Sequence, residues 1–328
     1  MPARKLLAYA AIYFLWGGSF LAIREIVGGA GGAAVPPFFA AGFRFTLAGA
    51  FLILWSRARG RTALTARQLA SAAMLGFVMF ACLYAPLFWA ETRIASGVAA
   101  IISAMIPLWI FAGELFVLRS QRATPLAAGG IVLGLGGVVL LTLGPGANSH
   151  GSGPHGAGAH SPALAIVLTL AGTVSWSAGT LASRRLTLPQ PQKANAGWQM
   201  FLGGLMLLAL SAAAGDFARL PPMPALLSAR VAGSMAYLII AASIIAYTAY
   251  VWLIAHDVPT RVSSYAYVNP VIALLLGAAF AGERLRPGQM AGAALVVTGV
   301  LATLQARSAH ASSDSAHSCD PAAVSEPS

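Results

Sequence analysis

The chain has 328 residues, of which 58% are hydrophobic and 9% are charged, and its mean hydropathy is +0.76. Because a soluble domain carries about 25% charged residues, this composition excludes a soluble protein and predicts an integral membrane protein. The net charge of +11 comes from cations distributed among the loops, so it indicates membrane topology and not a nucleic-acid partner.

Ten apolar runs follow one another along the chain. Since an apolar helix of about 20 residues crosses a bilayer, we predict an all-α membrane protein with ten transmembrane helices. The connections are mostly short and leave no room for a soluble catalytic or nucleotide-binding domain. The runs lie at about 7–27, 36–55, 69–90, 95–118, 125–143, 163–183, 195–214, 232–254, 260–281 and 288–305.

The last five runs repeat features of the first five in the same order, which indicates an internal repeat. A unit of five spans is odd, so the second copy crosses the membrane inverted. Inverted repeats are typical of secondary transporters, whose substrate site lies between the halves; a duplicated bundle with no passage is the alternative. The matched pairs are Trp16 and Trp176, Gly42 and Gly197, Arg44 and Gln199, Gly49 and Gly204, Tyr84 and Tyr247, Pro107 and Pro270, Gly130 and Gly292, and Gly137 and Gly299.

The chain divides into four segments. A Gly-rich stretch between the repeats predicts a flexible, solvated linker, and the low-complexity C-terminus predicts a disordered tail. The segments are residues 1–143 (first five-helix repeat), 144–162 (linker), 163–305 (second five-helix repeat) and 306–328 (tail).

The linker carries His150, His155 and His160 at five-residue intervals. No acidic or thiol ligand is nearby and nothing holds the imidazoles in place, so we predict a polar linker and not a metal site. The chain contains no GxxxxGK[ST] motif, so ATP-driven pumping by this chain is not expected. We therefore predict neither a metal nor another cofactor.

The distribution of cations orients the chain. With the N-terminus in the cytoplasm, most loop cations lie inside, as the positive-inside rule requires. The cations left outside are Arg93, Arg219, Arg230, Arg284 and Arg286. We therefore predict a multi-pass protein of the inner (plasma) membrane with both termini cytoplasmic and the linker periplasmic.

Two stretches resemble the EamA-type drug/metabolite transporter family. They are LWGGSF, which begins at Leu15, and SSYAYVNPVIALLLGAAFAGERLRPGQMAGAALVVTGV, which begins at Ser263. The resemblance covers both halves, and it implies a ten-helix basket with a central cavity and export of amino acids or other small metabolites. The chain departs from the family pattern in one place: the first half lacks the acidic turn of the second half, because the repeat places Ser120 opposite Glu283.

Arg44 lies inside the second apolar run. An intramembrane Arg commonly faces a cavity or a partner, so one interpretation is that it attracts an anionic group of the substrate. The other interpretation is structural: it pairs with Glu25 or Glu91, or extends its stem toward the interface.

Aromatic and polar side chains within the spans are further candidates for substrate contacts. Trp16 and Trp176 lie nearer mid-span than Trp89 and Trp252, which are better explained as interfacial anchors. Asn269 has a structural alternative, since its amide can bond a carbonyl that Pro270 leaves free. The hydrogen-bonding candidates are Tyr84, Ser103, Tyr247, Tyr265, Tyr267 and Asn269.

Three residues are candidates for hinges or gates. Pro107 and Pro270 each remove a backbone hydrogen bond near mid-membrane, so each is expected to bend its helix. Glu283 precedes Pro287 at the start of the last run, where a carboxylate favours the positive end of a helix; a gating role is the alternative.

We predict a secondary transporter that exports small metabolites such as amino acids by alternating access. A lipid or lipid-linked headgroup carrier of the same fold is the alternative, and a wide lateral opening between helices would favour it. An intramembrane enzyme would need His, Asp or Glu clustered within the spans, but the six His lie in loops and the tail, so we expect no enzyme. The expected partners are a small-molecule substrate and the bilayer; the oligomeric state stays open, and a monomer is compatible with the sequence.

Overall fold

A computed structural model describes residues 3–29, 34–60, 64–119, 124–143, 162–257, 262–280, 287–288, 290–299, 301–302 and 305. Throughout this part of the chain the regular structure is helical, with no strand. The predicted tail, Glu283 and all of the predicted linker except Pro162, where α9 begins, lie outside the described residues.

Seven helices in the described residues are long and apolar enough to cross a membrane. They are Ala3–Val27 (α1 Ala3–Ala10, η1 Ala11–Leu15, α2 Ser19–Val27), Pro37–Ala58 (α3), Ala66–Ala90 (α4 Ala66–Leu75, η2 Gly76–Ala81, α5 Cys82–Ala90), Ser96–Val117 (α6 Ser96–Ser103, α7 Ile106–Ala112, η3 Gly113–Val117), Pro162–Ser183 (α9), Gln192–Ala213 (α10) and Ala229–His256 (α12 Ala229–Tyr237, η5 Leu238–Tyr247, α13 Thr248–His256).

Three further apolar helices are shorter in their described cores. They are Ala128–Leu140 within α8 (Pro125–Leu143), Val268–Phe280 within α15 (Tyr265–Phe280), and Met290–Gly299. The short helices η4 (Asp216–Arg219) and α11 (Met223–Leu226) lie in the connection between α10 and α12. Each predicted apolar run thus contains a helix.

Local sequence sets several helix starts. Pro37 occupies the first turn of α3, where its missing N–H is not needed. Thr65 and Gln68 form a reciprocal cap at the start of α4: the Thr65 hydroxyl accepts from the Gln68 N–H at 3.2 Å, and the Thr65 N–H donates to Gln68 Oε1 at 3.0 Å. These caps place the helix ends at the boundaries that composition predicts.

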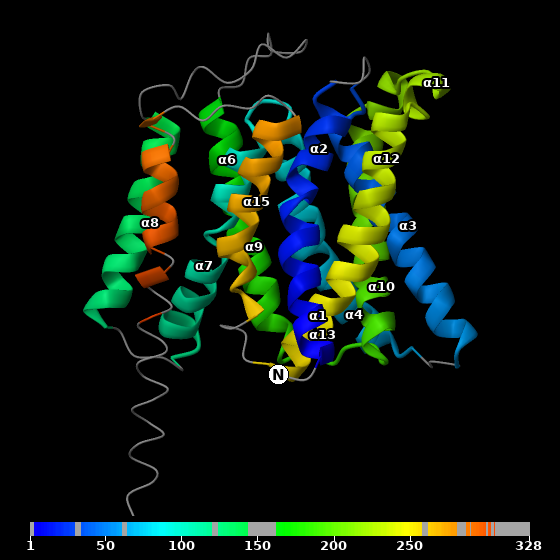
Figure 1. Cartoon of the computed structure of the whole chain (residues 1–328). Helices are drawn as coiled ribbons and strands as arrows, with labels where there is room; N and C mark the ends of the chain where they lie inside the picture. Colours follow the sequence, from blue (N-terminus) through cyan, green and yellow to red (C-terminus); the bar gives the residue numbers. More distant parts are fainter. Residues whose placement is uncertain are drawn as a thin grey trace, which may run out of the picture.

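Glycines allow two helix pairs to approach closely at opposite sides of the bundle. A Cβ on Gly49 of α3 would lie 2.7 Å from the carbonyl oxygen of Gly197 on α10, and one on Gly137 of α8 would lie 2.6 Å from that of Gly292. In Figure 1, α8 and the orange-red helix Met290–Gly299 lie on one side of the bundle, and α3 lies on the other. Small residues favour such contacts in lipid, where dispersion and not the hydrophobic effect drives helix association.

The central helices are irregular. Segments η1, η2, η3 and η5 are π-helical. Such segments leave backbone carbonyls without their usual partner and occur often at functional sites. The irregular backbone therefore indicates the centre of the bundle as the place to look for a site.

The two prolines sit differently in their helices. The helix is interrupted by a turn at Ala104–Met105, between α6 and α7, and Pro107 lies in the first turn of α7. Pro270 lies inside α15, which is continuous from Tyr265 to Phe280. Pro107 thus starts a new helical segment, whereas Pro270 is accommodated within one.

Candidate functional site

Aromatic side chains from both halves meet at the centre of the bundle. The Trp16 ring lies 4.9 Å from that of Tyr265, 5.2 Å from that of Tyr250 and 6.2 Å from that of Trp176. On the other side of Trp176, its ring lies 6.2 Å from those of Tyr84 and Tyr247. The edge-to-face arrangement of these rings packs favourably and forms a continuous buried wall.

A cavity of about 50 Å³ lies against this wall. It is lined by helices of both halves, and six of the predicted site residues contribute to it. They are Trp16, Tyr84, Ser103, Trp176, Tyr265 and Asn269. Since one water molecule occupies ~30 Å³, the cavity holds a water or two and is too small for an amino acid.

Arg44 lies behind Tyr84, one side chain away from the cavity. Its guanidinium stands 5.4 Å from the Tyr84 ring centre and 4.5 Å from that of Phe45, and Nε donates to Ser243 Oγ at 2.8 Å. The side chain is 1% exposed, and Nη1 has no hydrogen-bond partner. Burial of a cation with an unsatisfied hydrogen-bond donor costs free energy, so the site favours the approach of an anion.

The structure bears on the alternative partners of Arg44. Glu25 pairs with Arg230, whose Nε lies 3.1 Å from its carboxylate. The ion pairs found within the described part of the chain do not include Arg44, although Glu91 interacts with it electrostatically. Cation–aromatic contacts and Ser243 hold the guanidinium in place.

Gln199 occupies the position that the repeat aligns with Arg44. It is 2% exposed; its Oε1 accepts from the Tyr247 hydroxyl at 2.6 Å, and its Nε2 donates to Asn195 Oδ1 at 2.6 Å. The two halves thus each place a buried polar side chain next to the matched tyrosine, Tyr84 or Tyr247.

Polar contacts tie the first helix to the second half at both ends. At the end where the chain begins, Lys5 pairs with Asp257 at 2.6 Å, the Tyr9 hydroxyl donates to Asp257 at 2.7 Å, and the Tyr13 and Ser264 hydroxyls lie 2.6 Å apart. At the other end Glu25 of α2 meets Arg230 of α12. The cavity therefore lies between two sets of polar contacts that join the first helix to the second half.

The EamA-like transporter family matches residues 5–143 and again residues 163–305. The chain belongs to the EamA-like transporter family. It is 35% identical to YedA of Escherichia coli K12, an uncharacterized inner membrane transporter, over 85% of this chain and 83% of YedA. It is also 25% identical to a probable amino-acid metabolite efflux pump of Salmonella typhimurium LT2, over 88% of this chain and 91% of the pump.

Protein PecM of Dickeya dadantii is 24% identical over 88% of each chain. A solved crystal structure superposes with a TM-score of 0.60 at 22% identity, covering 93% of this chain and 99% of the other, and this likeness concerns the fold alone. As an EamA-like protein the chain is a multi-pass membrane transporter, and its family is one of transporters and not of enzymes.

Asn269 has a structural role in this EamA-like transporter. With its amide nitrogen assigned from the hydrogen-bond network, it donates to the Tyr13 carbonyl at 2.9 Å and the Tyr265 carbonyl at 3.2 Å. Tyr13 belongs to the π-helical segment η1. Asn269 therefore joins α15 to the first helix while also lining the cavity.

Ser103 and the tyrosines also make protein contacts. The Ser103 hydroxyl donates to the Ala99 carbonyl at 2.9 Å, and the Tyr250 and Thr180 hydroxyls lie 3.0 Å apart. The side chain of Tyr267 lies outside the described residues. Among those that are described, no group of three or more His, Cys, Asp or Glu side chains is arranged to hold a metal ion.

Sequence reasoning missed Ser19 and Phe20 in the cavity lining, and it missed four residues around the aromatic wall and Arg44. Tyr250 lies one helical turn after Tyr247, and Gln199 aligns with Arg44, so both carried a readable signal. Phe80, whose ring lies 5.0 Å from that of Tyr247, and Ser243 carried none, because each is an ordinary residue of an apolar run.

Proposed function

We propose that this EamA-like protein is a secondary transporter of the inner membrane that exports small metabolites such as amino acids. The observation that carries the proposal is the central cavity, which both halves line with aromatic and polar side chains and beside which Arg44 keeps an unpaired donor. The relative named an amino-acid metabolite efflux pump supports the substrate class.

The proposed architecture is ten transmembrane helices in two inverted five-helix repeats. The contacts between α8 and Met290–Gly299 support it, because a two-fold relation requires reciprocal contacts. Gly137 contacts Gly292, and Gly299 contacts Gly130. Since the repeat matches Gly130 with Gly292 and Gly137 with Gly299, these two contacts exchange under a two-fold axis.

Alternating access is the proposed mechanism. The small cavity and the polar contacts at both ends of the first helix support an occluded conformation as one of its states. Release of the Lys5–Asp257 pair would open one side, and release of the Glu25–Arg230 pair would open the other. Inverted repeats give two conformations of similar free energy, and the substrate would shift their populations.

The proposed topology places both termini in the cytoplasm, since most loop cations then lie inside. A cysteine introduced at Ser152, with Cys319 kept, should react with an impermeant reagent added to intact cells, and Cys319 should not. Protection of the cysteine at position 152 together with labelling of Cys319 would contradict the proposed topology.

The lipid-carrier alternative would need an opening from the side of the bundle into the cavity. A lateral groove of about 730 Å³ does exist, but none of its lining residues lines the central cavity. This separation supports the metabolite proposal.

A ligand-stabilisation screen tests the proposed function. Purified wild-type protein is heated with amino acids and common metabolites, and a stabilising compound is then tested for transport in proteoliposomes. An amino acid or another small anionic or zwitterionic metabolite should raise the unfolding temperature, and Arg44→Ala should abolish that shift. Stabilisation and transport of lipid-linked compounds alone would contradict the proposal.

A further inference from the structure

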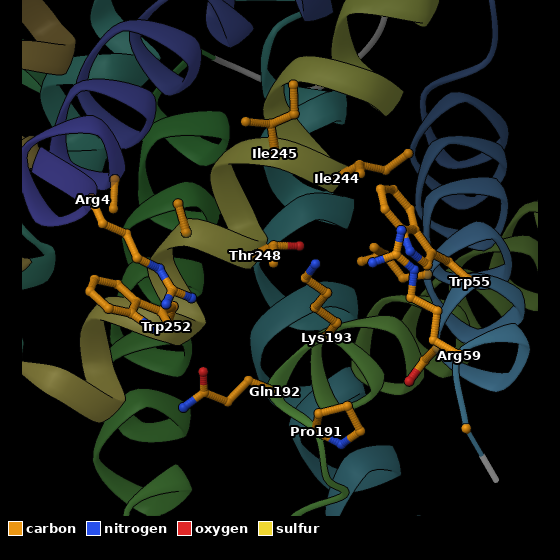
Figure 2. Close-up of a pocket in the computed structure, with 15 residues that line it drawn as sticks. Arg4, Trp55, Arg59, Pro191, Gln192, Lys193, Ile244, Ile245, Thr248 and Trp252 are labelled. Atoms are coloured by element: carbon orange, nitrogen blue, oxygen red, sulfur yellow. The ribbon is translucent and has the colours of Figure 1, made fainter. Parts of the chain in front are cut away.

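The lateral groove lies at the end of the bundle where the chain begins. It is about 730 Å³, within the range of ligand pockets. Figure 2 shows its walls: Arg4 and Trp252 on one side, Trp55 and Arg59 on the other, and Lys193 between them. The walls come from α1, α3, η5, α13 and the start of α10, so the groove is formed by segments far apart in the sequence.

The inner part of the groove is apolar and opens to the side. Leu52 at its base is 2% exposed, whereas Ile245 is 49% exposed and Trp55 is 37% exposed. Ile244 and Ala249 continue the apolar surface. In a membrane-spanning bundle such a surface faces hydrocarbon, so it suits an acyl chain.

The outer part of the groove carries uncompensated positive charge. Arg4 lies 4.7 Å from the Trp252 ring, and Arg59 and Lys193 lie 5.4 and 5.1 Å from the Trp55 ring. No carboxylate lines the groove, and none of the three cations forms an ion pair within the described residues. Three cations around one space therefore lack a counter-charge from the part of the protein that the structure describes.

The start of α10 adds to this field. Its first turn contains Lys193 and no acidic residue. A helix N-terminus carries partial positive charge, which an acidic side chain in the first turn would offset. Here the helix end and the lysine reinforce each other, which favours an anion between them.

We propose that the groove binds one anionic phospholipid. The phosphate headgroup lies among Arg4, Arg59 and Lys193, and an acyl chain lies along Leu52, Ile245 and the neighbouring apolar side chains. The tryptophans sit at the membrane interface, the depth that indole rings prefer and at which headgroups lie. A second copy of the chain fits less well, because a two-fold contact would bring like cations together.

Native mass spectrometry of the full-length protein tests this site, with phosphatidylglycerol and phosphatidylcholine of the same acyl chains as probes. The wild type should retain one phosphatidylglycerol with at least tenfold preference. The triple variant Arg4→Gln, Arg59→Gln, Lys193→Gln should lose that preference, since each cation near an anionic lipid contributes roughly fivefold in affinity. A matched triple variant of exposed cations outside the groove, Arg57→Gln, Arg67→Gln, Arg184→Gln, should keep it.

A second variant tests the apolar part without changing charge. Ile245→Trp should fill the groove and weaken binding of phosphatidylglycerol by tenfold or more, whereas Ile240→Trp on the same helix, outside the groove, should not. The proposal is overturned if the groove triple variant binds as the wild type does, if both triple variants lose binding equally, or if Ile245→Trp retains it. It is also overturned if the groove variants change the oligomeric state and leave lipid binding intact.

Discussion

The central cavity and the lateral groove use the same chemistry at different depths. Beside the cavity and within the groove, guanidinium or ammonium groups lie against aromatic rings: Arg44 on Phe45 and Tyr84, and Arg59 and Lys193 on Trp55. The cavity is about 50 Å³ and buried, whereas the groove is about 730 Å³ and open. Volume alone would select the groove as the substrate site, although the cavity is the place where both halves meet.

The depth of the cation decides what it can do. An exposed charge is solvated and screened by salt, so each of its contacts contributes little. Arg44 is desolvated, and its interaction with an anion is correspondingly stronger. We therefore expect substitutions at the cavity to affect transport far more than substitutions of the same type at the groove.

The largest effect is expected for Arg44→Ala. Because a hydrogen bond to a charged group contributes about 1.5–3 kcal/mol, transport in proteoliposomes should fall by about ten- to hundredfold. Loss of the contacts with Phe45 and Ser243 is offset in part by removal of a buried cation with an unpaired donor, so thermal stability should fall only modestly. Arg44→Lys should recover transport partly, since Lys keeps the charge without the planar fork.

Protein yield separates the two roles of Arg44. If Arg44→Ala lowers yield sharply and Glu91→Ala in the same chain restores it, the arginine is a structural partner and the proposed role is wrong.

A smaller effect is expected for Gln199→Leu, which changes the position matched to Arg44. The substitution removes neutral hydrogen bonds to Tyr247 and Asn195, so transport should fall by roughly two- to tenfold. Gln199→Glu keeps the acceptor for Tyr247 and serves as the control. A loss for Gln199→Leu as large as that for Arg44→Ala would show that charge is not what distinguishes the two sites.

Substitution of either proline should change transport by a few-fold, and the two substitutions should shift the conformational equilibrium in opposite directions. Pro107 lies beside a break at the cavity and Pro270 lies within a continuous helix, so Pro107→Ala and Pro270→Ala should favour opposite-facing conformations. In a background with both native cysteines replaced, single cysteines at Ser103 and Ser264 report accessibility. Equal labelling in both variants, or unchanged transport, would mean that the prolines serve packing alone.

The smallest effect on transport is expected at the groove. Arg59→Ala removes a cation that lies on an aromatic ring, as Arg44 does, but outside the proposed substrate path. Transport should stay within about twofold of the wild type when lipid composition is fixed, since exposed charges contribute little. A tenfold loss in the same proteoliposomes would place the groove on the path of the substrate.

The sequence by itself determined the class of protein, the helical runs and the family, because these depend on composition, length and local motifs. It also identified most of the aromatic and polar residues that line the cavity, since indole, phenol, hydroxyl and amide groups are conspicuous in apolar spans, but it identified none of the aliphatic ones. The proline positions and the matched glycines were equally readable.

Only the tertiary structure decided how these residues meet. The helices are apolar on nearly all sides, so sequence periodicity does not say which face points inward. The contact of Arg44 with Ser243 joins positions 199 residues apart. Phe80 belongs to the site only because the fold brings its ring against that of Tyr247. The groove likewise forms only when α1, α3, α10 and the continuous span of η5 and α13 come together. No local sequence pattern predicts a space that four separate segments enclose.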